Sequence, residues 1–291
     1  MVLWGFGRIP DGLAVRLGLA LGWFLEHVVR FRRGTVSQQQ ALAFPALDAA
    51  QRRALRHDTY RHLGLLVIED ARLPTLSPDK LTALCAISGT ENISPALARG
   101  KGVLVLAAHI GNWELGLAAT TRLGVRTRTV VKEIKGAVGQ YLVDRMRGAH
   151  GVETIPRRQA IRQIVATFRE GGAIGFVLDQ NMTSDEGVFV DFFGRPACTM
   201  AGLAVLAHRF DVPVLPVRFC RDPDLRRHHV EILPAIPWES VGPTPEDDVR
   251  HNTQRYTKAL EQMIVDHPAQ WLWVHRRWKT QPAAAVAPEA G

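Results

Sequence analysis

The 291-residue sequence contains only three cysteines, Cys85, Cys198 and Cys220, and no CxxC pair. Their odd number and wide spacing favour a reducing compartment over a disulfide framework. We expect each cysteine to be a small buried hydrophobic residue and not a nucleophile.

Two common catalytic motifs are also absent. The sequence has no HExxH motif, which argues against a zinc site built on its histidines. It has no G-x-S-x-G turn, which argues against a Ser-His-Asp hydrolase. We therefore expect neither a bound metal nor a resident cofactor.

The N-terminal region lacks a hydrophobic run long enough to cross a membrane. Its longest uncharged run, residues 17–25, is too short to span a bilayer. Charged residues such as Asp11 and Arg16 interrupt the apolar region and no small-residue cleavage site follows, so we expect no cleavable signal peptide.

The same region nevertheless has the composition of a helix that lies in a membrane interface. Residues 13–29 include Trp23, Phe24 and several leucines, and a basic run at residues 30–33 follows. An apolar helix with aromatic residues and a basic flank is typical of an anchor on an anionic membrane surface. We predict such an anchor over residues 1–35; the alternative is an ordinary amphipathic helix packed on the domain.

Acidic residues are fewer than basic ones, 28 against 36, which gives a formal net charge of +8 and a pI near 9.9. This excess favours an anionic partner, which could be nucleic acid, a membrane surface or an acidic carrier protein. Residues 271–279 interleave tryptophan with basic residues, a pattern that suits base stacking, a bilayer interface or a phosphorylated lipid. No recognised nucleic-acid-binding motif accompanies the charge, so we expect no nucleic-acid partner.

Strand-like runs alternate with helical patterns through most of the chain. This alternation predicts an α/β domain over residues 36–280, with a mostly parallel central sheet flanked by helices. The last residues, 281–291, are rich in alanine and proline and are predicted to be disordered. The expected strands cover residues 84–88, 103–108, 125–132, 173–178, 214–220 and 230–233.

Residues 103–117 carry the most suggestive arrangement of polar side chains. The strand predicted at 103–108 is followed by His109, a Gly111-Asn112 turn and Glu114. Asn112 is a suitable N-cap, so Glu114 falls in the first turn of a helix. We expect its carboxylate to accept the Nδ1 proton of His109 and leave Nε2 free as a general base. The alternative is a structural histidine capped by its neighbour.

Asp179 and Gln180 directly follow the strand predicted at 173–178. Because α/β sheets place their sites at the carboxyl ends of parallel strands, His109 and Asp179 are expected in one crevice; the alternative is a loop of Asx turns. Residues 188–194 form an apolar run with two phenylalanines, which either lines a groove for an acyl chain or belongs to the core.

Several segments, taken in order, resemble the bacterial lipid A late acyltransferase family of lauroyl- and myristoyltransferase type. AAHIGNWELG at residues 107–116 matches the family's histidine-and-acid (HX4E) motif, and Asp179-Gln180 matches its strand-end pair. Further matches are ALAFP at 41–45, YRHLG at 60–64, FxxFFGxPAxT at 189–199 and QWLWxHRRWKxxP at 270–282. The resemblance covers nearly the whole chain, and the ordered set is far more specific than any single motif.

The resemblance implies a glycerolipid-acyltransferase-like fold and an enzyme that moves a fatty acyl group from an acyl-carrier-protein thioester to a hydroxyl of a lipid A precursor. It implies His109 as the general base, supported by Glu114. It also implies action at the cytoplasmic face of the bacterial inner membrane, with the acyl carrier protein, the lipid and an anionic membrane surface as partners.

The remaining site residues follow from the same resemblance. Lys132, Arg195 and Arg276 would hold phosphates of the acceptor or the tetrahedral oxyanion, and Asp179 with Gln180 would shape the acceptor site. Residues 132–136 depart from the family's usual segment there, so the acceptor is less well defined than the reaction. The runner-up is an acyl-coenzyme A-dependent enzyme that acylates another glycolipid, such as phosphatidylinositol mannoside.

Overall fold

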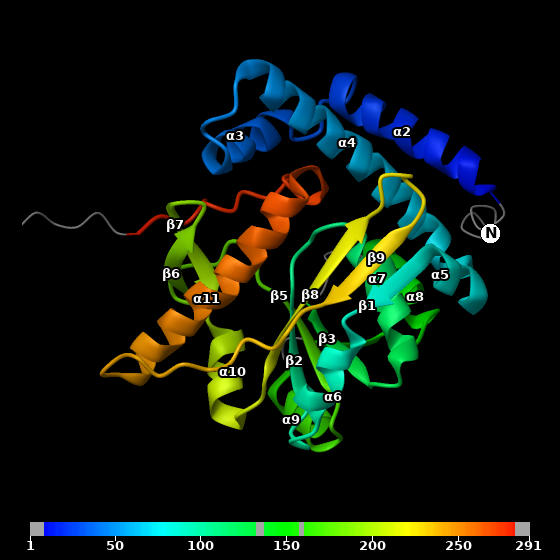
Figure 1. The fold of residues 1–291 in the computed structure, drawn as a ribbon. Coiled ribbons are helices and arrows are strands. Elements are labelled where there is room, and N and C mark those ends of the chain that lie inside the picture. Colours follow the sequence, from blue (N-terminus) through cyan, green and yellow to red (C-terminus); the bar gives the residue numbers. More distant parts are fainter. Residues whose placement is uncertain (1–8, 132–136, 157–159, 283–291) are drawn as a thin grey trace, which may run out of the picture.

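The computed structural model describes residues 9–131, 137–156 and 160–282, with a seven-stranded sheet at their centre (Figure 1). The strand order is β1-β9-β8-β2-β5-β3-β4. Neighbouring strands are parallel except β8 and β9, which form an antiparallel pair, so the predicted mostly parallel sheet is confirmed. The strands are β1 (Cys85–Ser88), β2 (Val103–Ala107), β3 (Thr127–Val131), β4 (Glu153–Pro156), β5 (Ala173–Val177), β8 (Val214–Arg221) and β9 (His228–Ile232).

Helices cover both faces of this sheet, because successive side chains of each strand point to opposite faces and both sets are apolar. Val103 and Ala107 belong to one hydrophobic core, and Leu104 and Leu106 to the other. The first core includes α5 (Pro78–Leu84), α6 (Ile93–Leu97), α7 (Trp113–Thr120) and α8 (Ala137–Gly148). The second includes α9 (Ala160–Arg169), α10 (Gly202–Phe210) and α11 (Pro245–Asp266).

A small second sheet packs beside α11. It is a hairpin of β6 (Gly187–Phe192) and β7 (Arg195–Met200). Phe192 is fully buried against Trp271 and Trp278, so this side chain of the apolar run at 188–194 belongs to the core, and none of the run lines the large cavity described below. The same burial removes these tryptophans, together with Trp273, from any surface on which bases could stack.

Three N-terminal helices form a layer across the carboxyl ends of β2 and β8 (Figure 1). They are α2 (Asp11–His27), α3 (Arg33–Ala43) and α4 (Ala49–Arg72). α4 begins at a capping box that Asp48 and Gln51 form. The predicted boundary at residue 35 falls inside α3. No helix in the described part of the chain combines the length and apolar character needed to cross a membrane.

Glycines allow α2 and α4 to approach closely. A Cβ atom placed on Gly64 would lie 2.2 Å from the carbonyl oxygen of Gly18 and 2.4 Å from the amide nitrogen of Gly22. Real Cβ atoms do not approach backbone atoms so closely, so any side chain at Gly64 must push the two helices apart.

We therefore expect Gly64→Ala to lower the free energy of unfolding by about 1–3 kcal/mol through overpacking, measured by urea unfolding. Gly34→Ala is the matched control, because a Cβ on Gly34 in α3 meets no atom within 4 Å. Equal stability of the two variants would contradict the close α2–α4 contact.

Candidate active site

His109 and Asp179 meet at the carboxyl edge of the sheet. Ala107, at the end of β2, pairs in register with Val177, at the end of the parallel strand β5. His109 and Asp179 each follow two residues later, which brings their side chains together. The Nδ1 atom of His109 lies 2.8 Å from Oδ1 of Asp179, so the predicted convergence of these two residues is confirmed.

Asp179 is held by three N–H groups. Besides Nδ1–H of His109, its carboxylate accepts hydrogen bonds from the backbone N–H of His109 at 3.0 Å and from Nε1–H of Trp271 at 2.7 Å. Burial opposes the charge of Asp179, but the attraction of His109 and these hydrogen bonds outweigh it and hold the pKa of this carboxyl well below its usual range. The carboxylate therefore fixes the His109 tautomer with the proton on Nδ1 and the lone pair on Nε2.

The contact with Asp179 also changes the pKa of His109. Burial alone would lower the pKa of this imidazole, but the neighbouring Asp179 carboxylate outweighs burial and raises the pKa above its usual value. The unprotonated Nε2 lies 3.4 Å from the amide nitrogen of Gln180. His109 also lines a large cavity, so a substrate hydroxyl can reach this base.

The predicted hydrogen bond between His109 and Glu114 is wrong. Asn112 does cap α7, with its Oδ1 accepting from the backbone N–H of Leu115 at 2.8 Å, and Glu114 does lie in the first turn. The Glu114 carboxylate instead accepts two hydrogen bonds from Arg147 on α8, at 2.5 and 2.9 Å. A permanently charged guanidinium with two parallel donors is a stronger partner than a neutral imidazole.

Trp113 contacts both the His109–Asp179 pair and the Glu114–Arg147 pair. Its ring packs edge-on against His109, with ring centroids 4.9 Å apart, and its Nε1–H lies 3.2 Å from Glu114. The charge of Glu114 adds to the rise in the pKa of His109 without a hydrogen bond between the two residues, and its carboxylate holds Arg147, which lines the cavity.

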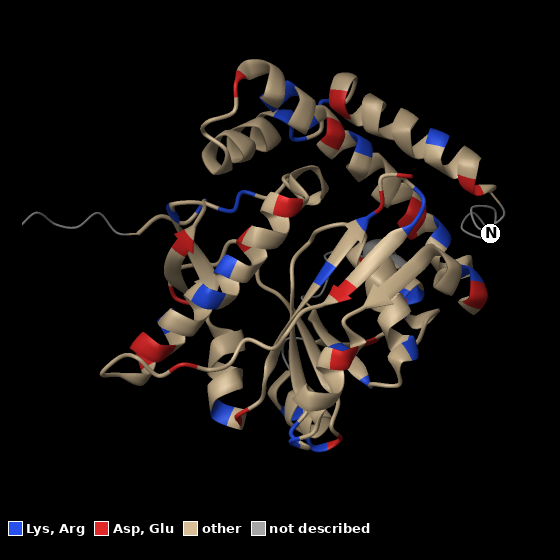
Figure 2. Ribbon diagram, viewed as in Figure 1, with Lys and Arg blue, Asp and Glu red and all other residues tan. Residues whose placement is uncertain are grey.

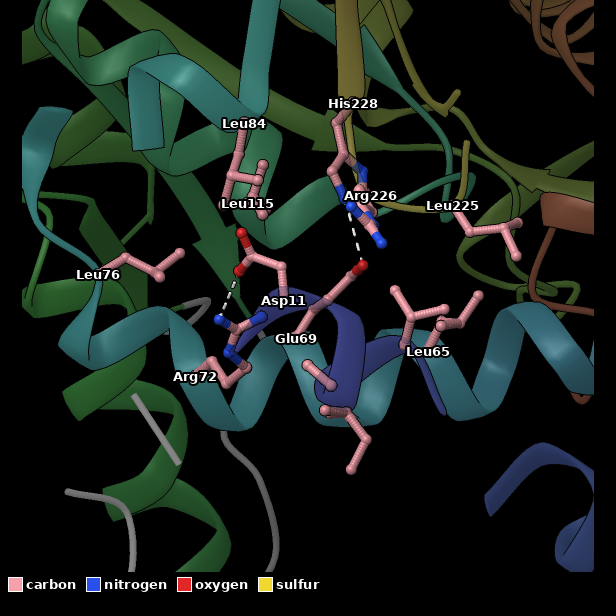
Figure 3. Close-up of a pocket in the computed structure, with 13 residues that line it drawn as sticks. Asp11, Leu65, Glu69, Arg72, Leu76, Leu84, Leu115, Leu225, Arg226 and His228 are labelled. Atoms are coloured by element: carbon pink, nitrogen blue, oxygen red, sulfur yellow. Dashed lines mark hydrogen bonds and ion pairs between the residues drawn. The ribbon is translucent and has the colours of Figure 1, made fainter. Parts of the chain in front are cut away.

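The turn that carries His109 is tied to the helical layer by a buried ionic cluster. Arg221 forms two hydrogen bonds with Glu69 on α4, and Asn112 donates to the same carboxylate at 2.9 Å. Burial opposes ionisation of Glu69, but Arg221 and His228 outweigh it and lower the pKa of this carboxyl. Figure 3 shows Glu69 pointing from α4 toward His228. This cluster fixes the start of α7 and therefore the turn before it.

Two other predicted residues lie at the cavity, and a third lies outside it. Gln180 and Arg276 both line the cavity. Arg195 lies outside it, because the β6–β7 hairpin directs this exposed side chain to the carbonyl of Leu42 at 3.1 Å. Lys132 is outside the described residues.

A second imidazole, which we did not single out from the sequence, faces the first. The ring centroids of His275 and His109 are 6.2 Å apart, and the Gln180 amide nitrogen lies 3.4 Å from Nε2 of each. Burial and the nearby His109 lower the pKa of His275, so it is neutral at pH 7. The only feature of the sequence that points to His275 is its position inside the aromatic and basic run 271–279.

The cavity beside His109 has a volume of about 1570 Å³ and is mostly apolar. Its lining includes the basic side chains of Arg32, Arg147, Arg276 and Lys279. No group of three or more histidine, cysteine or acidic side chains that could hold a metal ion occurs within residues 9–131, 137–156 and 160–282.

A histidine oriented by a buried carboxylate, open to a large apolar cavity, defines a site suited to general-base chemistry on a lipid-like substrate. Comparison with known proteins gives the family. Residues 1–280 match the family described as bacterial lipid A biosynthesis acyltransferase, and the chain belongs to that family and is an acyltransferase.

Individual relatives agree with this assignment. The chain is similar to the lipid A biosynthesis palmitoleoyltransferase of Escherichia coli (strain K12), with 24% identity over 282 residues, 97% of this chain and 90% of that protein. The lauroyltransferase of the same strain is 23% identical over 291 residues, again 97% and 90% of the two chains. A phosphatidylinositol mannoside acyltransferase of Mycobacterium tuberculosis is 29% identical over 215 residues, 71% of this chain and 65% of that protein.

Proposed function

We propose that this enzyme transfers a fatty acyl group from an acyl-carrier-protein thioester to a hydroxyl of a lipid A precursor. The observation that carries the proposal is the His109–Asp179 pair, whose free Nε2 faces a cavity of about 1570 Å³ in a member of the lipid A acyltransferase family. The basic side chains in the lining of the cavity suit a phosphorylated acceptor, and the net charge of +8 suits an acidic carrier protein.

In the proposed reaction, Nε2 of His109 takes the proton of the acceptor hydroxyl while the hydroxyl oxygen bonds to the thioester carbonyl carbon. Asp179 stabilises the imidazolium that forms. When the tetrahedral intermediate collapses, the C–S bond breaks, and the leaving thiolate takes the proton from His109. The thioester is already activated, so no covalent enzyme intermediate is needed and the enzyme mainly supplies positioning and proton transfer.

Arg147 and Arg276 are two basic residues that can assist. Both line the cavity, and Glu114 holds the guanidinium of Arg147 in position. We propose that they bind the developing oxyanion or phosphates of the two substrates, and that Gln180 contacts the acceptor beside Nε2.

The test is acyl transfer by purified enzyme with defined substrates. Donors are acyl carrier protein and coenzyme A thioesters of the same chain, and acceptors are a lipid A precursor and a phosphatidylinositol mannoside, with products identified by mass spectrometry. Transfer from the carrier protein to the lipid A precursor is expected. Transfer only from acyl-coenzyme A to the mannoside would instead establish the alternative suggested by the mycobacterial relative.

We further propose that α2 docks on the cytoplasmic face of the bacterial inner membrane. One side of α2, including Ala14, Gly18 and Gly22, is buried against α4. On its other side Trp23 and Phe24 are 54% and 45% exposed, and the arginines at residues 30, 32 and 33 follow. Figure 2 shows both basic and acidic positions on this helical layer. Exposed aromatic rings beside basic residues are typical of a helix that lies in an anionic interface.

The double variant Trp23→Ser, Phe24→Ser should therefore bind vesicles containing phosphatidylglycerol at least tenfold more weakly than wild type, because each buried aromatic ring contributes roughly 1.5–3 kcal/mol. Co-sedimentation measures the effect. Val241→Ser, which changes an exposed apolar residue far along the chain, is the control. Equal vesicle binding by all three proteins would rule out α2 as the docking surface.

A further inference from the structure

Residues 60–64, one of the segments by which the chain resembles its family, have no part in the site described so far. They belong to α4, in the helical layer across the carboxyl ends of β2 and β8 (Figure 1). His62 in this segment is buried. Its Nε2 atom lies 3.3 Å from the carbonyl oxygen of Gly111, two residues after His109. A side chain of α4 therefore contacts the turn that carries the base.

Which nitrogen of His62 carries the proton follows from its surroundings. Burial lowers the pKa of His62 to about 3, so the imidazole is neutral at pH 7 and has a single N–H group. The Nε–H of Arg221 donates to Nδ1 of His62 at 3.5 Å, and a guanidinium has no acceptor atom to offer in return. The proton of His62 therefore lies on Nε2, which donates it to the carbonyl of Gly111.

One network binds both polar groups of Gly111. The Arg221 side chain, paired with Glu69, orients His62, which donates to the C=O of Gly111. The Arg221 backbone forms two hydrogen bonds with the side-chain amide of Gln270, at 2.7 and 3.0 Å. The carbonyl of Gln270 in turn accepts from the N–H of Gly111 at 3.1 Å. Arg221 thus fixes Gly111 from both sides, once through His62 and once through Gln270.

The position of Gly111 affects the base because α7 starts directly after it. Asn112 is the N-cap of α7 and Trp113 its first residue. The ring of Trp113 packs edge-on against the ring of His109, with centroids 4.9 Å apart. Without a donor to the Gly111 carbonyl, the peptide plane between residues 111 and 112 would be free to rotate, and Trp113 would shift with the start of α7. His109 would keep Asp179 as its partner but lose the packing that directs its ring.

We propose that His62 is a positioning residue for the catalytic base: its Nε2–H holds the Gly111 carbonyl and thereby keeps the ring of His109 in the reactive orientation. This rests on the proposed function and adds to it a residue of the helical layer. His62 does not line the cavity, so it does not touch the substrates. Its loss should therefore lower kcat and leave KM unchanged.

Two amide variants of His62 differ mainly in reach. The amide nitrogen of glutamine can occupy the place of Nε2, whereas that of asparagine reaches only the place of Nδ1. His62→Asn should lower kcat for acyl transfer by about tenfold or more, because displacements of about 1 Å near reacting groups have effects of this order. His62→Gln should keep kcat within about threefold of wild type. His62→Leu, which has no donor, should behave like His62→Asn, and KM should stay within about twofold in all three.

Two further measurements separate positioning from stability. Asp48→Ala removes the capping box of α4 and should destabilise this helix without contacting the turn, so its kcat should match that of wild type while thermal unfolding occurs at a lower temperature. The tautomer of His62 is measured in wild type by nitrogen NMR of isotope-labelled histidine, with His62→Gln identifying its signals. We expect a protonated Nε2 and an unprotonated Nδ1, and this readout needs neither activity nor a variant that lacks the donor.

If His62→Asn and His62→Leu unfolded at a lower temperature but kept wild-type kcat, His62 would only stabilise the helical layer and the proposal would be overturned. Equal losses of kcat in His62→Gln and His62→Asn, or a proton on Nδ1 of His62, would overturn it as well. Failure of the proposed function gives a different result, since wild type would then transfer no acyl group to a lipid A precursor, whatever the tautomer of His62.

Discussion

His109→Ala should lower kcat for acyl transfer by about 10²–10⁴-fold, the usual contribution of a positioned general base. Its Nε2 is the atom that faces the cavity with a lone pair, because Nδ1 is bound to Asp179 at 2.8 Å. Alanine leaves no group to take the hydroxyl proton, whereas substrate binding and the fold should survive. The measurement is single-turnover transfer with saturating substrates, together with thermal unfolding of the variant.

His275→Ala is the control for this variant. Its imidazole lines the same cavity and lies 6.2 Å from that of His109, but among the described residues no carboxylate forms a hydrogen bond with its ring. We expect a loss below tenfold. A larger loss in His275→Ala than in His109→Ala would identify the other histidine as the base.

Asp179→Asn should be nearly as damaging, with kcat lowered by about 10²–10⁴-fold. Both carboxylate oxygens of Asp179 accept from N–H groups: Nδ1–H and the backbone N–H of His109, and Nε1–H of Trp271. An asparagine amide has only one acceptor oxygen, so its NH₂ group must oppose one of these donors. The imidazole can relieve the clash by moving its proton to Nε2, which removes the base.

Asp185→Asn is the matched control, since this carboxylate lies on the surface in the loop after the same strand. Its transfer rate should stay within twofold of wild type. If Asp179→Asn kept more than a tenth of wild-type kcat while remaining folded, the buried carboxylate would not be what makes His109 a base.

The sequence could predict the meeting of His109 and Asp179 because the rule behind it is topological. Both residues follow apolar strand-like runs, and parallel neighbours in a sheet end at the same edge. The N-cap by Asn112 and the first-turn position of Glu114 could be predicted for a similar reason, since both depend on a few consecutive residues.

The partner of Glu114 could not be predicted in this way. Arg147 lies 33 residues later on another helix, and only the packing of α8 beside α7 brings it to the carboxylate. The short spacing between His109 and Glu114 favoured a local pair, but Trp113 and the guanidinium compete for the same oxygens. Sequence spacing shows which residues are neighbours along the chain. It does not show whether a residue from another helix is the stronger hydrogen-bond partner.

Packing against distant parts of the chain also decides which side chains of the C-terminal run 271–279 are buried. Its tryptophans and bases alternate in a way that suits a surface, yet Trp271 and Trp273 are core residues, while His275 and Arg276 line the cavity. Arg277 is fully buried and donates to the carbonyl of Cys198 in β7 at 2.8 Å. Which side chains of such a run point inward depends on the elements packed around it.

The most direct test of the His109–Asp179 pair is the pH dependence of kcat/KM for acyl transfer in wild type and in Asp179→Asn. The base is active when Nε2 is unprotonated, so activity must fall as the pH drops through the pKa of His109. Asp179 raises that pKa, so the wild-type fall should be centred above the ordinary imidazole value of about 6.5. Burial without the carboxylate lowers it, so the residual activity of the variant should fall at a lower pH. An identical midpoint in the two proteins would contradict the assignment of Asp179 as the partner of the catalytic base.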